Sequence, residues 1–176
     1  MTDPAVDVPG DMIYLGRVEK PHGLKGGLRV RLFGGYGTPG MPVGTRLVID
    51  REAEVTVSRC TERGESMFNI TFREIGSREE AEGYRNAGLY ITPEEADERL
   101  EFVPLYMFSG FTIISRGSGA RVADVEPSGP NPLLLVEMGE KTFHVPVAMV
   151  MNEGDVDWDD GIIHLDLPEG LEDLPL

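Results

Sequence analysis

Residues 14–32, which read YLGRVEKPHGLKGGLRVRL, decide the fold of the first half of this chain. Apolar and polar residues alternate on both sides of a glycine-rich turn at residues 21–27, a pattern typical of a β-hairpin. We therefore predict strands over residues 12–18 and 27–33. Gly23, Gly26 and Gly27 make the turn possible because glycine readily adopts positive φ angles.

The same stretch holds the densest basic cluster of the chain. Its charge is about +4, within a 176-residue protein whose net charge is −15. Such a local change of sign indicates a contact surface for an anionic partner. The turn is not a P-loop, because the spacing and the following Ser or Thr are missing, so an ordinary hairpin turn stands as the alternative to a phosphate-binding one. The charged residues are Arg17, Glu19, Lys20, Lys25, Arg29 and Arg31.

Short strands joined by many turns are also expected in the rest of the first half. The 22 glycines and 13 prolines exceed the usual globular share and favour this organisation over a helical bundle. Further strands at residues 46–49, 54–61, 67–71 and 89–91 complete about six, which is typical of a small antiparallel barrel. A capping box at residues 77–80 predicts a short helix to Asn86. The charged, proline-started segment 92–100 resembles a linker.

A second strand-rich unit follows, with strands expected at residues 110–115, 121–125, 133–137, 142–145 and 162–165. Asp160-Gly161 predicts a hairpin between residues 158–159 and 162–163. Residues 117–176 hold thirteen acids and two bases. A surface of this kind repels nucleic acid and attracts a basic protein, although acidic residues that only maintain solubility are the alternative.

Several classes of function are excluded. The single cysteine, Cys60, permits neither an intramolecular disulfide nor a multi-cysteine zinc site, and the three histidines have no metal-like spacing. Residues 155–161 resemble a calcium loop but lack its glycine and its final Glu, so an acidic hairpin is favoured. Neither a nucleophile elbow nor a dinucleotide motif is present. We expect no catalytic residue, no metal and no cofactor.

No apolar run is long enough to cross a membrane. Residues 1–11 lack the features of a signal peptide and are interpreted as a short disordered tail. We therefore expect a cytoplasmic protein with no membrane contact.

Residues 15–26, LGRVEKPHGLKG, resemble the opening signature of the RimM family of bacterial ribosome maturation factors. SREEAE at 77–82 and GLYI at 88–91 resemble the helix and strand that close the first domain of that family. GPNPLLLV at 129–136, VP at 145–146 and DLPEGL at 166–171 resemble its later landmarks. The resemblance extends over residues 12–173. The family usually has Glu where this chain has Gly27.

The resemblance implies an all-β fold of two small β-barrels. The first, at residues 12–92, is a six-stranded barrel like those of translation factors. A linker at 93–101 would join it to a PRC-type barrel at 102–174. The implied function is that of a non-catalytic assembly factor, expected to be a monomer. Such a factor binds the immature small (30S) ribosomal subunit and assists maturation of its head and processing of 16S rRNA. The implied protein partner is the nineteenth small-subunit ribosomal protein, which is basic.

Two groups of site residues follow as hypotheses. Arg17, Lys20, His22, Lys25 and Arg29 are expected to contact rRNA phosphates. In the family, an aromatic pair followed by Asp-Leu-Ile-Gly opens the second domain and contacts the subunit. The corresponding segment here, residues 101–110, departs from that pattern and reads EFVPLYMFSG. Phe102 and Tyr106 lie near the position of the pair without aligning with it, and they are the candidate protein-binding residues.

Two other functions compete with this hypothesis. One is an acidic PRC-type adaptor that holds protein partners without binding the ribosome. The other is an enzyme built on His22 and Lys25.

Overall fold

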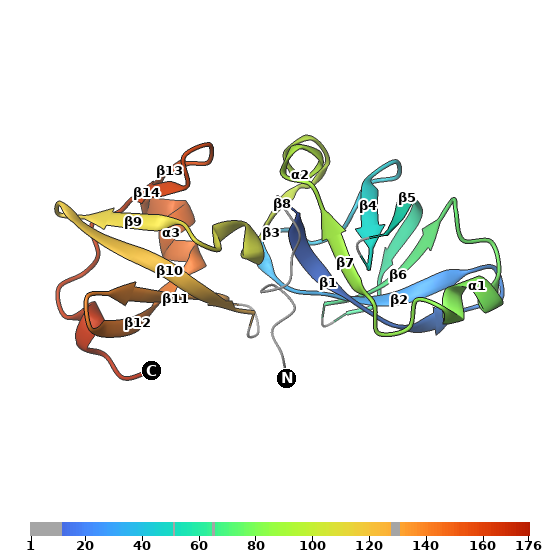
Figure 1. Cartoon of the computed structure of the whole chain (residues 1–176), viewed down its shortest axis with the longest axis horizontal. Coiled ribbons are helices and arrows are strands. Elements are labelled where there is room, and N and C mark those ends of the chain that lie inside the picture. The colour runs from blue at the N-terminus through green and yellow to red at the C-terminus, as the bar shows by residue number, and fades with distance from the viewer. Residues whose placement is uncertain (1–11, 51, 65, 128–130) are drawn as a thin grey trace. The chain divides into compact units, whose positions relative to one another are not determined.

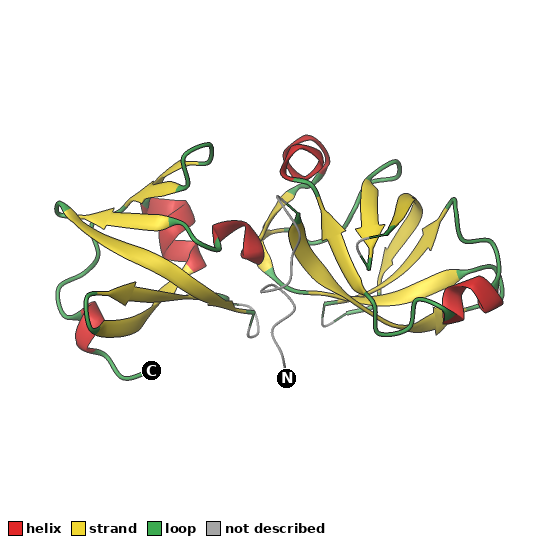
Figure 2. Cartoon of the chain, in the orientation of Figure 1, coloured by secondary structure: helices red, strands yellow, loops and turns green. Residues whose placement is uncertain are grey.

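The structure is a computed structural model that describes residues 12–50, 52–64, 66–127 and 131–176. Strands make up 48% of the chain and helices 16%, which confirms the all-β class (Figure 2). The chain forms two compact units. The first unit contains the described residues up to Phe33 together with Gly37–Pro104. The second unit contains Gly34–Tyr36 and Leu105–Leu176. The tail at residues 1–11, expected to be disordered, lies outside the described residues.

The first unit is a closed barrel of six strands, as the sequence predicts (Figure 1). All neighbouring strands are antiparallel. The strands follow the order β1 (Ile13–His22), β2 (Gly27–Leu32), β6 (Met67–Phe72), β5 (Ala53–Glu62), β4 (Arg46–Ile49) and β7 (Gly88–Ile91), and β7 returns to β1.

Alternation along most of the strands fills the barrel with apolar side chains. Val18, Val30, Val57, Ile70 and Leu89 are completely buried, and each comes from a different strand. The residues between them face outward and are mostly polar, which is the pattern of a sheet with one buried face. The hydrophobic effect therefore closes the barrel and leaves its outer face available for other contacts.

Helix α1 (Arg78–Glu82) begins as the capping box predicts, since the Ser77 hydroxyl accepts a hydrogen bond from the Glu80 N–H. The helix is shorter than predicted and ends before Gly83, a residue that is unfavourable in a helix interior. It packs against β1 and β2 near the turn that joins them (Figure 1).

The segment expected as a linker, residues 93–101, instead contains helix α2 (Pro93–Arg99) within the first unit. The Thr92 hydroxyl accepts from the Glu95 N–H and caps the helix. The buried Glu95 carboxylate accepts from the backbone N–H of Arg46 at 2.6 Å and from its guanidinium at 3.2 Å. A buried carboxylate, bonded to the Arg46 backbone and to its exposed guanidinium, thus holds in place a segment whose other charges resemble those of a linker.

The second unit is built on a six-stranded sheet (Figure 1). Its strands are β12 (Lys141–Pro146), β11 (Leu133–Met138), β10 (Ser118–Glu126), β9 (Thr112–Ser115), β14 (Ile162–His164) and β13 (Asp155–Asp157), in that order. β14 is parallel to β9, and the other pairs are antiparallel. Helix α3 (Val147–Glu153) joins and contacts both edge strands, β12 and β13. Within the described residues the strand order of this sheet runs from edge to edge, whereas a closed barrel is expected from the sequence.

The remaining elements are short and have no sequence pattern of their own. β3 (Gly35–Gly37) and β8 (Phe102–Pro104) are strands of only 3 residues each. Two 3-10 helices, η2 (Leu105–Phe108) and η3 (Leu171–Asp173), belong to the second unit, where η3 contacts β12. Over the described ranges, no helix combines the length and the apolar character needed to span a membrane.

Replacing Glu95 by Ala should lower the free energy of unfolding by about 1–3 kcal/mol, because the Arg46 N–H loses its acceptor. Burial raises the pKa of Glu95, but hydrogen bonds and charge from Arg46 outweigh this effect and lower the pKa below 4.5. The stabilisation is therefore present at neutral pH and is lost as the pH falls below 4.5. Urea denaturation at neutral and acidic pH measures this difference in the free energy of unfolding.

The exposed Asp97 of the same helix provides the control. Asp97→Ala should change the free energy of unfolding by less than about 0.5 kcal/mol. Equal effects of the two substitutions would contradict the role given to Glu95.

Candidate nucleic-acid interface

A β-bulge in β1 sets which of its side chains face outward. The pairing of β1 with β2 shifts between Val18 and Lys20, so that one extra residue lies in β1. As a result Glu19 and Lys20 both avoid the barrel interior, Pro21 is buried, and His22 is exposed. Without the bulge, strict alternation would turn Lys20 and His22 inward.

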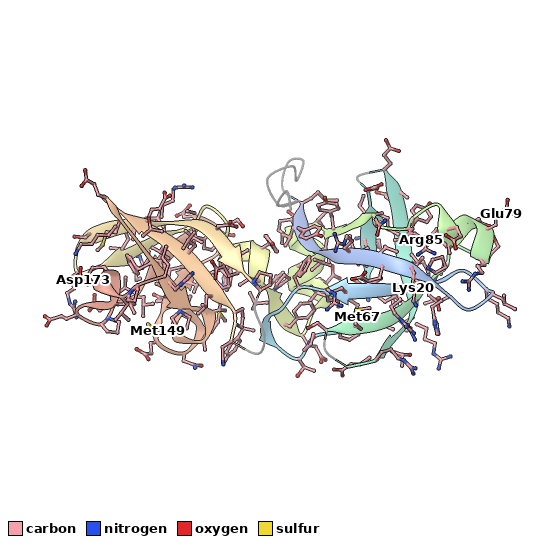
Figure 3. The ribbon with its side chains drawn as sticks, turned by 90° about the horizontal axis from the view of Figure 1, so that it is seen from below. Lys20, Met67, Glu79, Arg85, Met149 and Asp173 are labelled. Carbon is pink, nitrogen blue, oxygen red and sulfur yellow. The ribbon has the colours of Figure 1, made fainter. Side chains whose placement is uncertain are left out.

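Cross-strand pairing brings polar residues of three strands together on the outer face. Lys20 lies opposite Arg29 of β2, and Arg29 lies opposite Asn69 of β6. Figure 3 shows Lys20 where β1 and β2 approach their turn, with Met67 of β6 on the neighbouring part of the barrel wall. The row is continuous because β2 pairs with β1 on one side and with β6 on the other.

Hydrogen-bond donors surround the imidazole ring of His22. The Arg29 Nε donates to the Asn69 Oδ1 at 3.2 Å, which directs the Asn69 amide nitrogen toward the His22 Nε2, also at 3.2 Å. The Arg29 Nη2 lies 3.4 Å from the His22 Nδ1. Guanidinium and amide nitrogens only donate, and a neutral imidazole has one acceptor nitrogen. The cluster therefore has more donors than acceptors.

The charges around His22 are all positive. Its pKa is lowered from 6.5 by partial removal of water from the ring and by repulsion from the cations around it, which are Arg29, Arg63, Arg78 and Lys20 in decreasing order. Among the residues that the structure describes, no carboxylate forms an ion pair with any of these four cations. We call Lys20, His22, Arg29, Arg63, Asn69 and Arg78 the His22 cluster. Its geometry favours an anion that supplies the missing acceptors.

The β1–β2 turn beside the cluster is held in place by two features. The Arg78 Nη1 donates to the Gly23 carbonyl at 3.1 Å. Gly26 has a φ of +90°, and a Cβ placed on it would lie 2.5 Å from the Ile75 carbonyl oxygen. The turn therefore projects Lys25 and Leu24 outward, and Leu24 is 82% exposed.

The structure brings together three of the five residues expected to contact RNA, namely Lys20, His22 and Arg29. Lys25 is exposed on the adjacent turn. Arg17 lies on the other side of the bulge, half-buried and opposite Arg31. Arg31 is partly neutralised by Glu19 at 3.0 Å.

Sequence reasoning missed Arg63, Arg78 and Asn69 as members of the cluster. They come from the β5–β6 connection, α1 and β6, which are distant from the hairpin in the chain. Strand pairing between β2 and β6 and the packing of α1 against β1 and β2 bring them near His22. The exposed apolar Leu24 was missed as well, because a leucine within a turn gives no periodic signal.

The two residues expected to bind a protein partner differ in accessibility. Phe102 of β8 is only 5% exposed, so this structure does not offer its ring to a partner. Tyr106 lies in η2 and is half-buried. Among the described residues, no group of three or more His, Cys, Asp or Glu side chains is arranged to hold a metal ion.

The sequence of this chain is similar to that of known proteins. The RimM N-terminal domain family matches residues 13–96. A ribosome maturation factor RimM from Lactobacillus delbrueckii subsp. bulgaricus is 27% identical over 164 residues, covering 89% of this chain and 96% of that protein. The corresponding protein of Deinococcus radiodurans is 28% identical over 152 residues, covering 84% and 78%. A crystal structure from Pseudomonas aeruginosa, described as a 16S ribosomal RNA processing protein RimM, has 16% identity and a TM-score of 0.40. That match covers 90% of this chain and 98% of the other.

Residues 13–96 therefore have the sequence of a RimM N-terminal domain. Along most of its length the chain is similar to ribosome maturation factors named RimM.

The lowered pKa of His22 predicts that RNA binding takes up a proton. A phosphate beside the cluster reduces the repulsion and raises this pKa, so affinity for an RNA oligonucleotide should increase from about pH 8 to about pH 5.5. In the free protein, a fall in pH has the opposite effect, because it lowers stability instead of raising affinity. The unfolded chain binds the proton first, so the free energy of unfolding decreases as the pH falls below 6.5.

Calorimetry in two buffers of different ionisation enthalpy measures the proton uptake. His22→Gln should retain binding and lose most of the pH dependence. The same proton uptake in His22→Gln would assign it to another group.

Gly26→Ala should destabilise the protein more than Gly23→Ala. Both glycines have positive φ, but the new Cβ meets the Ile75 carbonyl only at Gly26, whereas space is open at Gly23. We expect a cost of about 1 kcal/mol from φ at either position. The clash at Gly26 adds to this cost. Thermal unfolding of both variants measures the difference, and equal destabilisation would contradict the packing described for the turn.

Proposed function

We propose that this chain assists maturation of the small ribosomal subunit by binding its immature form without catalysing a reaction. The His22 cluster and Lys25 contact rRNA phosphates, and the acidic second unit holds a basic ribosomal protein. This places the protein in the cytoplasm, in the course of 16S rRNA processing and maturation of the subunit head. The relatives named ribosome maturation factor support a role in ribosome maturation. The His22 cluster supports the contact with rRNA phosphates.

The observation that carries the RNA contact is the excess of donors around His22. Arg29 and Asn69 face both ring nitrogens, and no carboxylate among the described residues forms an ion pair with the surrounding cations. Phosphate oxygens are acceptors only, and they carry the negative charge that this arrangement lacks. A protein surface with a compensating carboxylate would not need an external anion to supply acceptors and negative charge.

The second unit supports a different kind of partner. Residues 117–176 contain thirteen acids and two bases, and both bases are paired, Arg121 with Glu137 and Lys141 with Asp173. A surface with this balance attracts a basic protein and repels the RNA backbone. We propose that the partner is the nineteenth small-subunit ribosomal protein, which fits this chemistry. Tyr106 is a candidate contact on this unit.

Reversing the charge of Lys25 and Arg29 tests the RNA contact. The double variant Lys25→Glu with Arg29→Glu should bind immature small-subunit particles much more weakly. The slope of log affinity against log salt should fall by about 1 for each phosphate that the variant no longer neutralises. Cosedimentation with purified particles over a salt series measures both quantities.

The control makes the same change in net charge elsewhere. Arg116→Glu with Arg121→Glu alters exposed residues of the second unit and should leave the salt slope unchanged. Equal binding by both double variants at every salt concentration would exclude the His22 cluster as an RNA contact. If the unmodified protein remained at the top of the gradient, that result would favour the adaptor function.

A further inference from the structure

The second unit exposes a large aromatic side chain within an acidic turn. Trp158 lies in the connection between β13 and β14 and is 40% exposed. It is the single tryptophan of the chain. Tryptophan is depleted from ordinary protein surface and is the residue type most enriched at the centres of binding interfaces.

The Trp158 ring rests on two phenylalanines. Its centroid lies 5.5 Å from that of Phe108 and 6.0 Å from that of Phe111, and these two rings contact each other edge to face at 5.9 Å. Phe108 is completely buried, so part of the indole is fixed against the core while the rest faces solvent. A ring held in this way loses little conformational freedom when a ligand covers it.

The charges next to this ring are negative and unpaired. Asp155, Asp157, Asp159 and Asp160 are exposed, and none of them forms an ion pair with a described residue. The turn therefore combines an apolar aromatic face with uncompensated negative charge, which is complementary to a cation that has a flat apolar face.

We propose that Trp158 anchors a docking surface for an arginine-containing segment of a basic protein. The inference rests on the proposed function, because the partner is the basic protein that the second unit is proposed to hold. The arginine guanidinium stacks on the exposed indole face, and the adjacent aspartates accept its hydrogen bonds. Lysine supplies the charge but lacks the planar guanidinium that stacks on an aromatic ring and forms bidentate hydrogen bonds with carboxylates. An RNA base also stacks on tryptophan, but the aspartates repel its phosphates.

The single tryptophan makes the test local, because all indole emission comes from Trp158. The full-length protein is titrated with a ten-residue oligo-arginine peptide and with an oligo-lysine peptide of the same length. Oligo-arginine should shift the Trp158 emission in a saturable manner and bind about threefold or more tighter than oligo-lysine. Equal affinity for the two peptides, or no change in emission, would overturn the stacking.

Substitutions separate this surface from the general acidity of the unit. Trp158→Ala should weaken binding of a dye-labelled oligo-arginine peptide, measured by anisotropy, by about tenfold. Asp159→Asn with Asp160→Asn leaves the aromatic base intact and should weaken binding to a similar degree. Glu140→Gln with Glu169→Gln removes the same charge from other exposed positions of the unit and should have a small effect. Equal weakening in the two double variants would overturn the proposal.

Two further outcomes would assign the surface to another occupant. Quenching of Trp158 by a single-stranded RNA oligonucleotide would make it an RNA contact. Emission that changes with protein concentration alone, together with dimers in sedimentation, would make it a contact with a second copy.

The Lys25→Glu, Arg29→Glu variant keeps the two proposals apart. It should bind the particle much more weakly while still binding oligo-arginine, whereas Trp158→Ala should retain RNA binding. Unaltered peptide binding by Trp158→Ala would therefore overturn the inference and leave the RNA contact standing.

Discussion

The bulge between Val18 and Lys20 is the constraint on which the candidate interface depends. A strand with strict alternation would bury Lys20 and His22 in the barrel, which apolar side chains already fill. The extra residue instead places Pro21 inside and directs His22 toward Arg29 and Asn69. Because β1 pairs with β2 on one side and β7 on the other, this register cannot shift without opening the barrel. A local irregularity thus fixes the chemistry of the outer face.

The His22 cluster places stability and function in opposition. Four cations around one imidazole repel each other and lower its pKa, which costs free energy in the isolated protein. The buried barrel core offsets this cost, so the cluster persists without a compensating carboxylate. Binding an anion would relieve this repulsion, which is the physical basis of the proposed contact with phosphate. The second unit is acidic, so in the proposed function each unit serves a partner of opposite charge sign.

Much of the first unit could be predicted from sequence, because its strands alternate regularly and its turns carry glycine. The hairpin at residues 14–32, the six strands and the Ser77 cap follow from such local signals. Helix α2 could not be predicted in this way, because Ala96 is its single buried apolar residue. Its other buried residue, Glu95, resembles an exposed charge in the sequence until the fold places Arg46 beside it. Arg63, Asn69 and Arg78 join His22 only through strand pairing and packing distant in the chain. Phe102 was a candidate contact from motif position, and its burial in β8 depends on tertiary packing.

Photo-crosslinking of the full-length protein to immature small-subunit particles, followed by sequencing of the crosslinked peptides, tests the central claim most directly. The account predicts that RNA is attached to peptides from residues 20–29, 63–69 and 78, and that protein crosslinks come from the acidic second unit. RNA attached mainly to residues 105–176, or to the α2 side of the barrel around Arg46 and Arg99, would contradict it.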